Sequence, residues 1–127
     1  MADALQVSIE PDPGALRQVR SSLRSWLLAI GAQRIDDVVL AVDEAVANAV
    51  EHGHGDHGVA TAVITLSAHI GADDAVHIEV RDAGRWRVPT PNGERGRGIG
   101  IMRSVMDEVD VRSSTSGTVV VMRRRRS

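Results

Sequence analysis

The spacing of apolar residues changes several times along this chain, and the order of the changes limits the folds it can adopt. Leu5, Val7 and Ile9 alternate with polar residues, which predicts a short strand. Helical spacing follows over two segments, 13–31 and about 34–52. Later apolar runs predict more strands, with a helix of about residues 99–106 among them. These predicted strands cover residues 59–67, 76–81, 109–112 and 118–122.

This order of elements predicts an α+β fold. It runs strand, helix, helix, strand, strand, loop, helix, strand, strand, so we expect a two-layer sandwich with helices on one face of a mixed, mostly antiparallel sheet. The 127 residues fit a single domain. Only 2% of them are aromatic, and neither Phe nor Tyr occurs, so we expect a core of Val, Ile, Leu, Ala and Met.

Composition excludes several kinds of chemistry. The chain has no cysteine, which rules out disulfides, thiolate metal sites and cysteine nucleophiles and favours a cytoplasmic location. All 15 basic residues are arginine, so a P-loop lysine, a Schiff-base lysine and a Ser-Lys pair are also excluded. We expect neither secretion nor a membrane span, because the sequence carries no signal-peptide pattern and no stretch of about 18 apolar residues.

Arginines 123–126 form the most basic segment. The net charge of -2 includes them, so the rest of the chain is acidic and we expect no direct binding of nucleic acid. The segment itself is predicted to be a basic tail. It is a solvated terminus, a junction to a neighbouring domain or an arm for nucleic acid.

One edge of the second predicted helix carries polar residues that core packing does not explain. Glu44 and Asn48 are four residues apart, so they project from the same side of the helix, and Glu51 and His52 continue that side. This places a carboxylate and a carboxamide on one edge. The edge is either exposed to solvent or part of a site.

A carboxylate follows a predicted buried strand. Asp82 has the parity of Val76, Ile78 and Val80, which places it on their apolar face. Buried in this way, the carboxylate needs hydrogen-bond donors. It either caps the next turn or accepts from a ligand such as the exocyclic amine of adenine, and Gly84 allows a ligand to approach the backbone closely.

A glycine-rich segment, GERGRGIGIM, precedes the third predicted helix. Gly96, Gly98 and Gly100 leave backbone amides open at the positive end of the helix dipole, which suits phosphate groups. Arg95 and Arg97 supply positive charge there in place of lysine. The segment is therefore a candidate phosphate-binding element.

Together, these segments resemble the boxes of a known ATPase superfamily, the Bergerat-fold group of gyrase, sensor histidine kinases and mismatch-repair ATPases. EAVANAVEH (44–52), VRDAGRW (80–86), GRGIGIM (96–102) and SGT (116–118) look like its N, G1, G2 and G3 boxes. The short length and the MDEV run at 106–109 resemble the anti-sigma-factor serine kinase branch. The form of residues 82–89 is similar to its high-GC Gram-positive type, often fused to phosphatase domains. The resemblance covers roughly residues 5–123.

The resemblance implies a role for each matching residue. Glu44 would be the general base for a serine hydroxyl, and Asn48 would hold Mg²⁺. Asp82, helped by Thr118, would bind adenine, and Arg95 or Arg97 would neutralise the γ-phosphate. The residues implied to bind the ATP cofactor are Asn48, Asp82, Gly84, Arg95, Gly96, Arg97, Gly98, Ile99 and Thr118.

The resemblance also implies partners. They are a sigma factor and an anti-anti-sigma factor with a STAS-type domain, whose serine would be phosphorylated in the cytoplasm by a homodimeric kinase. Two alternatives remain open. One is a nucleotide-sensing binding module without kinase activity, and the other is the ATPase domain of a histidine kinase, although the chain lacks a helical segment bearing an acceptor histidine.

Two further features have competing interpretations. Arg17, Arg20 and Arg24 form a stripe on the first predicted helix, which is either a solvated face or the docking surface for the partners named above. The HGHGDH segment (52–57) is either a helix end followed by a loop or, as an alternative, a transition-metal site. His69 and His77 have no evident partners in the sequence.

Overall fold

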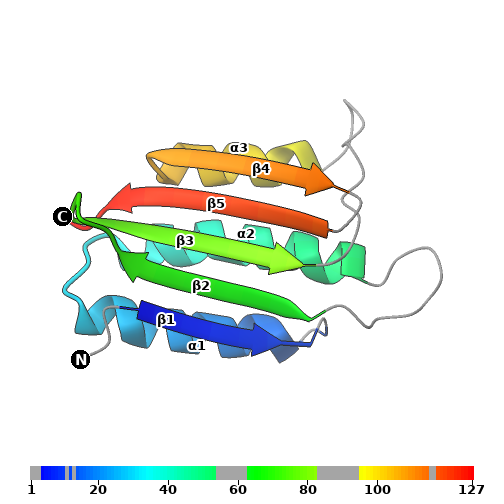
Figure 1. Cartoon of the computed structure of the whole chain (residues 1–127), viewed down its shortest axis with the longest axis horizontal. Helices are drawn as coiled ribbons and strands as arrows, with labels where there is room; N and C mark the ends of the chain where they lie inside the picture. Colours follow the sequence, from blue (N-terminus) through cyan, green and yellow to red (C-terminus); the bar gives the residue numbers. More distant parts are fainter. Residues whose placement is uncertain (1–3, 11, 13, 54–62, 83–94, 115–116) are drawn as a thin grey trace.

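The computed structural model describes residues 4–10, 12, 14–53, 63–82, 95–114 and 117–127, which form a two-layer α+β fold (Figure 1). In these residues the chain forms, in order, β1 (Ala4–Ile9), α1 (Gly14–Ala29), α2 (Ile35–Gly53), β2 (Ile64–Ile70), β3 (Ala75–Asp82), α3 (Arg95–Val105), β4 (Glu108–Ser114) and β5 (Gly117–Arg125). None of the described helices is long and apolar enough to cross a membrane.

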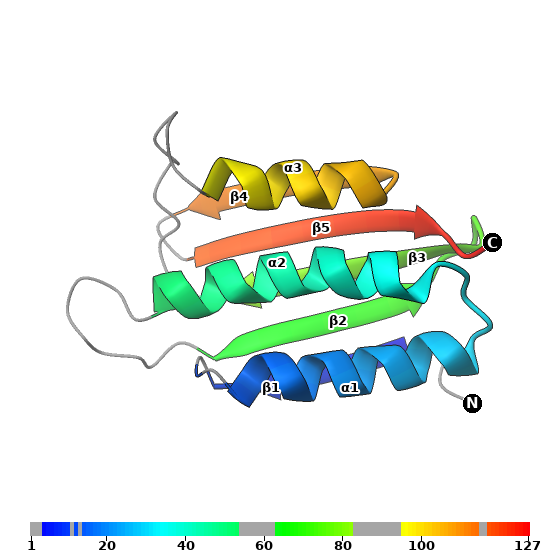
Figure 2. The ribbon, with the colours of Figure 1, turned by 180° about the vertical axis from the view of Figure 1, so that it is seen from behind.

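The strands form one sheet in the order β1-β2-β3-β5-β4. Each pairing in the described part of the chain is antiparallel. Figure 2 shows all three described helices lying across one face of the sheet, with α2 between α1 and α3. The predicted fold class is therefore confirmed, with an antiparallel sheet where we expected a mixed one.

The core lies between the two layers and depends mainly on aliphatic side chains. On α1, Val19, Leu23 and Leu27 are buried in the core. Trp26 is buried with them at 4% exposure, so the expectation of a core without aromatic residues was wrong at this position. Its large ring fills the space that several smaller side chains would otherwise need to fill.

Helix α2 is the most deeply packed helix because it has neighbours on three sides. It contacts α1, α3 and the sheet. Its apolar face is correspondingly broad and includes alanines at 41 and 45 as well as the predicted valines. The buried apolar residues of α2 are Val38, Val39, Ala41, Val42, Ala45, Val46 and Ala49.

Two predicted elements, β2 and α3, begin several residues away from the predicted starts. Strand β2 begins at Ile64 rather than at Val59 and continues to Ile70. Helix α3 begins at Arg95, four residues before the predicted start, because we assigned the glycines to a loop. Glycine disfavours a helix interior, but the cost is small enough for tertiary contacts to override it.

The arginine run at 123–126 is not a solvated tail. β5 extends through Arg125, and Arg123 forms an ion pair with Asp73 (Nε to Oδ2, 2.9 Å). Arg126 pairs with Asp74 (2.8 Å), and Arg124 donates to the carbonyl of Val105 near the end of α3. These contacts lie at the end of the sheet where α1 joins α2, so the run ties several turns together.

The arginine stripe on α1 also has structural partners. Nε of Arg20 donates a bifurcated hydrogen bond to the two carboxylate oxygens of Asp43 (2.7 and 2.8 Å). Arg24 donates to Asp36 at 2.8 Å. Both acids belong to α2, so two of the three arginines bridge the helices at the surface. Arg17 is exposed.

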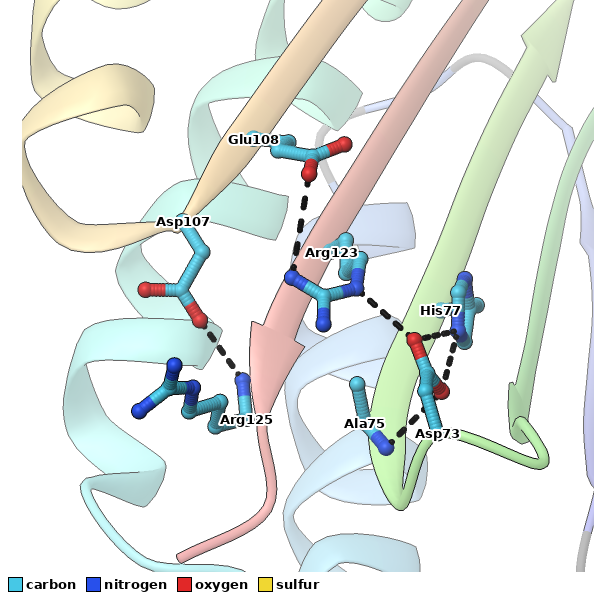
Figure 3. Close-up of polar contacts among 7 residues, drawn as sticks. All are labelled: Asp73, Ala75, His77, Asp107, Glu108, Arg123 and Arg125. Carbon is cyan, nitrogen blue, oxygen red and sulfur yellow. Dashed lines mark hydrogen bonds and ion pairs between the residues drawn. The ribbon is translucent and has the colours of Figure 1, made fainter.

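Asp73 sits at the centre of a polar cluster on the open side of the sheet (Figure 3). Its carboxylate accepts from Arg123, from Nε2 of His77 at 3.0 Å and from the amide of Ala75 at 3.1 Å. The Arg123 guanidinium, followed by His77, holds the pKa of the Asp73 carboxyl well below its usual range. His77 also stacks on His69, with ring centroids 5.1 Å apart, so both histidines have partners that the sequence did not indicate.

The lowered pKa of Asp73 predicts a dependence of stability on pH. The carboxylate stabilises the fold above its unfolded pKa of about 4, and this contribution is lost as the pH falls further. We expect Asp73→Asn to lower Tm by a few degrees at pH 7, and the difference from the native chain to shrink towards pH 3. Thermal melts across this range measure the effect.

Asp110→Asn is the matched control. Asp110 pairs with Arg112 on the exposed face of β4, where both side chains are more than half exposed, so its removal should change Tm little at any pH. Equal shifts in the two variants would contradict the role given to Asp73.

Candidate functional site

The predicted site residues that the structure describes lie at one end of the molecule. This end holds the last turns of α2, the first turn of α3, the end of β3 and the start of β5 (Figure 2). It lies opposite the arginine-rich end described above. The site is therefore separated from the contacts that close the far side of the sandwich.

Three polar side chains are buried in the described residues, and all three belong to the predicted site. They are Asn48 and Asp82, each 7% exposed, and Thr118 at 1%. The rest of the buried set is hydrophobic. Burial of polar groups costs free energy, so their concentration at one end of an otherwise apolar core indicates a binding function.

Glu44 and Asn48 lie on the edge of α2 that faces α3. A Cβ atom added to Gly98 would lie 3.2 Å from Oε2 of Glu44 and 3.4 Å from Nδ2 of Asn48. The two side chains therefore approach a single point on the α3 backbone. Only a residue without a side chain leaves this space open.

Glu44 differs from its neighbour Asp43 in its surroundings. Arg20 neutralises Asp43 through two short hydrogen bonds. No ion pair within the described residues involves Glu44, which is half-buried. The carboxylate of Glu44 is thus held at the site without a fixed cationic partner among these residues.

Residues 95–102 of the glycine-rich segment belong to α3, where a loop was expected up to residue 98. The amides of residues 95–98 are the first four of the helix, and such amides have no acceptor within the helix. No acidic residue lies in this turn, whereas α2 begins with Asp36 and Asp37. The positive end of the α3 dipole is therefore available to an anion.

Asp82 and Thr118 lie side by side on the helix-facing side of the sheet. Asp82 of β3 is directly opposite Thr118 of β5, and Thr118 is opposite Ser113 of β4. The hydroxyls of Ser113 and Thr118 are 3.2 Å apart. This row brings a carboxylate and two hydroxyls together. The sequence analysis missed Ser113, because the only indication was its alternation with the apolar residues of an edge strand.

The structure describes some of the predicted residues only in part or not at all. Gly84, Trp86 and residues 54–57 of the HGHGDH segment lie outside the described residues. Arg95, Gly96 and Arg97 belong to α3, but their side chains are not described. Ile99 is half-buried and packs against the core, so it anchors the first turns of α3.

The donor groups at Glu44 and Asn48 are compatible with a magnesium ion. Mg²⁺ prefers oxygen ligands, which a carboxamide and a carboxylate provide, and it is commonly held by few protein groups together with phosphates. Both side chains lie close to the start of α3, since a Cβ at Gly98 would be 3.2 Å from Oε2 of Glu44 and 4.0 Å from Oδ1 of Asn48. The described residues contain no cluster of three or more His, Cys, Asp or Glu that would suit a metal held by protein alone.

Comparisons with known proteins agree with this geometry. A family model described as the histidine kinase-like ATPase domain matches residues 9–124. An anti-sigma F factor from Clostridium acetobutylicum is 36% identical over 106 residues, covering 73% of this chain and 71% of the relative. The crystal structure of the RsbU and RsbW domains of Rv1364c from Mycobacterium tuberculosis is 30% identical, with a TM-score of 0.77 over 96% of this chain.

The solved structures are longer proteins. This chain spans 32% of the Mycobacterium tuberculosis chain. It spans 30% of a blue-light activated histidine kinase from Erythrobacter litoralis, which shares the fold with a TM-score of 0.61 at 24% identity over 73% of this chain.

The fold and the site define the class as an ATP-binding domain with a two-layer α+β architecture. The chain belongs to the histidine kinase-like ATPase family, and within it to the anti-sigma-factor branch that its four sequence boxes resemble. The resemblance drawn from the sequence is thereby confirmed.

Gly98 provides a direct test of the site. In Gly98→Ala the new methyl group would crowd Oε2 of Glu44, the flexible end of a side chain, so the carboxylate should move while the fold remains. We expect the affinity for ATP to fall by about tenfold or more, since the methyl group also approaches Nδ2 of Asn48 and stands among the first amides of α3, which would bind the phosphates. Calorimetric titration with ATP measures this.

Gly100→Ala is the control on the same helix. Nothing lies within 4 Å of a Cβ at Gly100, so this variant should bind ATP normally and gain up to ~1 kcal/mol of stability from helix propensity. Normal ATP binding by Gly98→Ala would show that the close approach of the two helices is unimportant for the site.

Proposed function

We propose that this chain is an ATP-dependent serine kinase that binds a sigma factor and phosphorylates a serine of an anti-anti-sigma partner with a STAS-type domain. The observation that carries the proposal is the identity of the buried polar side chains. Asn48, Asp82 and Thr118 fall in three of the four boxes by which the chain resembles anti-sigma-factor kinases. Membership of the family supports the same conclusion.

In this proposal Glu44 is the general base. Its carboxylate accepts the proton of the attacking serine hydroxyl while that oxygen forms a bond to the γ-phosphorus and the bond between the γ-phosphorus and the β,γ-bridging oxygen breaks, releasing ADP. The contrast with Asp43 supports this role, because Asp43 is held by Arg20 and Glu44 has no such partner in the described residues. A general base must be able to approach the serine hydroxyl, and a fixed ion pair would restrict this approach.

Asn48 would hold Mg²⁺ through its side-chain oxygen, close to the phosphate end of the site. When bound, the ion supplies positive charge that offsets the charge of the phosphates. The amides at the start of α3, including those of Gly96 and Gly98, would donate to phosphate oxygens, and Arg95 or Arg97 would neutralise the γ-phosphate.

Asp82 would recognise adenine by accepting a hydrogen bond from its exocyclic amine, with Thr118 beside it. A buried carboxylate next to a buried hydroxyl gives a polar patch in an apolar wall, which is typical of a site that orients a base. Gly84 would leave room for the base against the end of β3.

The partner proposal rests on the relatives. The anti-sigma F factor and the structure containing an RsbW domain motivate a sigma factor as one partner. The exposed surface of α1 is the proposed docking face, with Arg17 and the outer sides of Arg20 and Arg24 available to it. We propose that the kinase acts as a homodimer in the cytoplasm.

Loss of the Asp82 carboxylate should weaken nucleotide binding. Asp82→Asn replaces an acceptor with a group that also donates, so we expect ATP affinity to fall by about 1–3 kcal/mol, or about 5- to 150-fold. Calorimetric titration measures this. An unchanged affinity would remove the adenine-binding role of Asp82.

Loss of the Glu44 carboxylate should slow phosphoryl transfer and leave ATP binding mostly intact. We expect Glu44→Gln to lower the rate by about 10²-fold or more, because the variant cannot accept the serine proton. The assay incubates the chain with Mg-ATP and proteins captured from the native cell extract, followed by mapping of phosphorylated residues.

The same assay distinguishes the alternatives. Phosphoserine on a captured partner, lost in Glu44→Gln, supports the kinase. Binding of a partner without phosphoserine in either form would instead identify a nucleotide-sensing binding module. Phosphohistidine would identify an ATPase domain of the histidine kinase type.

A further inference from the structure

A row of polar side chains crosses three neighbouring strands at the site. Asp82 of β3 is opposite Thr118 of β5, which is opposite Ser113 of β4. All three have the parity of the helix-facing side, shown by Val80 and Val120 two residues away on β3 and β5. Ser113 is thus the outer member of a row whose inner members are buried.

Ser113 contacts Thr118 directly. The two hydroxyl oxygens are 3.2 Å apart in a partly buried position, and either can donate. A hydroxyl has one hydrogen and two acceptor lone pairs, so the direction of this bond decides what Thr118 offers to a ligand. If Ser113 donates, the hydrogen of Thr118 is not used in this bond.

Adenine imposes one direction on this pair. Its exocyclic amine donates, and the ring nitrogens on either side of the amine, N1 and N7, accept. With the amine on Asp82, a Thr118 hydroxyl that meets one of these ring nitrogens would have to donate to it. Thr118 does so best when its own oxygen accepts from Ser113.

We propose that Ser113 is a positioning residue for base recognition, which donates to Thr118 and so fixes the Thr118 hydroxyl as a donor to a ring nitrogen of adenine. This inference rests on the adenine site of the proposed function. Ser113 acts through Thr118 and does not itself contact the base.

The molecule contains a matched pair that lacks this role. Ser8 of the edge strand β1 is opposite Thr65 of β2, and their hydroxyls are 3.5 Å apart. Ser8 alternates with the helix-facing Val7 and Ile9, so this pair lies on the open face of the sheet. If a cross-strand hydroxyl pair contributes only to the stability of the sheet, removing its serine should not change the preference between nucleotides at either place.

The test compares three nucleotides. ATP, 1-deaza-ATP and 7-deaza-ATP are titrated calorimetrically into the native chain and into Ser113→Ala, Ser113→Thr and Ser8→Ala. The two analogues each replace one ring nitrogen with carbon. Ser113 is exposed, so its substitution is expected to leave the fold intact, and thermal melts check this.

We expect the native chain to bind one analogue roughly three- to tenfold more weakly than ATP, the effect of one lost hydrogen bond. Ser113→Ala should lower the affinity for ATP by a similar factor. This variant should then bind ATP and the analogue that the native chain disfavours equally well. Ser113→Thr should restore the preference, and Ser8→Ala should behave as the native chain.

The inference is overturned if Ser113→Ala loses the same factor for all three nucleotides, or none for any of them. It is also overturned if the native chain binds both analogues as tightly as ATP. These results leave the proposed function standing, provided Asp82→Asn still weakens ATP binding. If Asp82→Asn does not weaken ATP binding, the proposed adenine site itself is wrong.

Discussion

The position of α2 is the constraint on which the rest of the structure depends. Its broad apolar face packs on the centre of the sheet, and α1 and α3 pack along its sides. Because the helix cannot rotate without exposing its valines, the edge that carries Glu44 and Asn48 has a fixed direction. The site is therefore oriented by hydrophobic packing, and its polar groups need only a few contacts of their own.

Much of the fold follows from the spacing of apolar residues. The periodicity of residues 13–31 and 34–52 predicted two helices to within a few residues, because a long pattern outweighs local variation. The start of α3 was missed because glycine has a poor helix propensity, and contacts with α2 decide the outcome there. The sequence also did not predict that Arg123–Arg125 continue a strand, since Asp73, the partner of Arg123, is 50 residues away in the chain.

The sequence predicted the burial of Asp82 and the position of Asn48 beside Glu44, but not the neighbouring Ser113. Asp82 was placed correctly by counting along one strand, and Asn48 by its distance from Glu44 on one helix. Ser113 could not be found in this way, because its significance depends on the pairing of β4 with β5 and of β5 with β3. Pairing of strands is set by tertiary structure, whereas parity is a property of the strand itself.

The strand order has a consequence for how the protein is made. β5 follows β4 in the sequence but lies between β3 and β4 in the sheet, so β4 has no neighbour to pair with until β5 has left the ribosome. Thr118 reaches its place beside Asp82 in the same step. A nascent chain that ends before β5 therefore contains both helices of the proposed phosphate end but lacks the strand that would lie beside the adenine base. Nucleotide binding during synthesis would thus report completion of the sheet, and ATP would stabilise only chains that have passed this point.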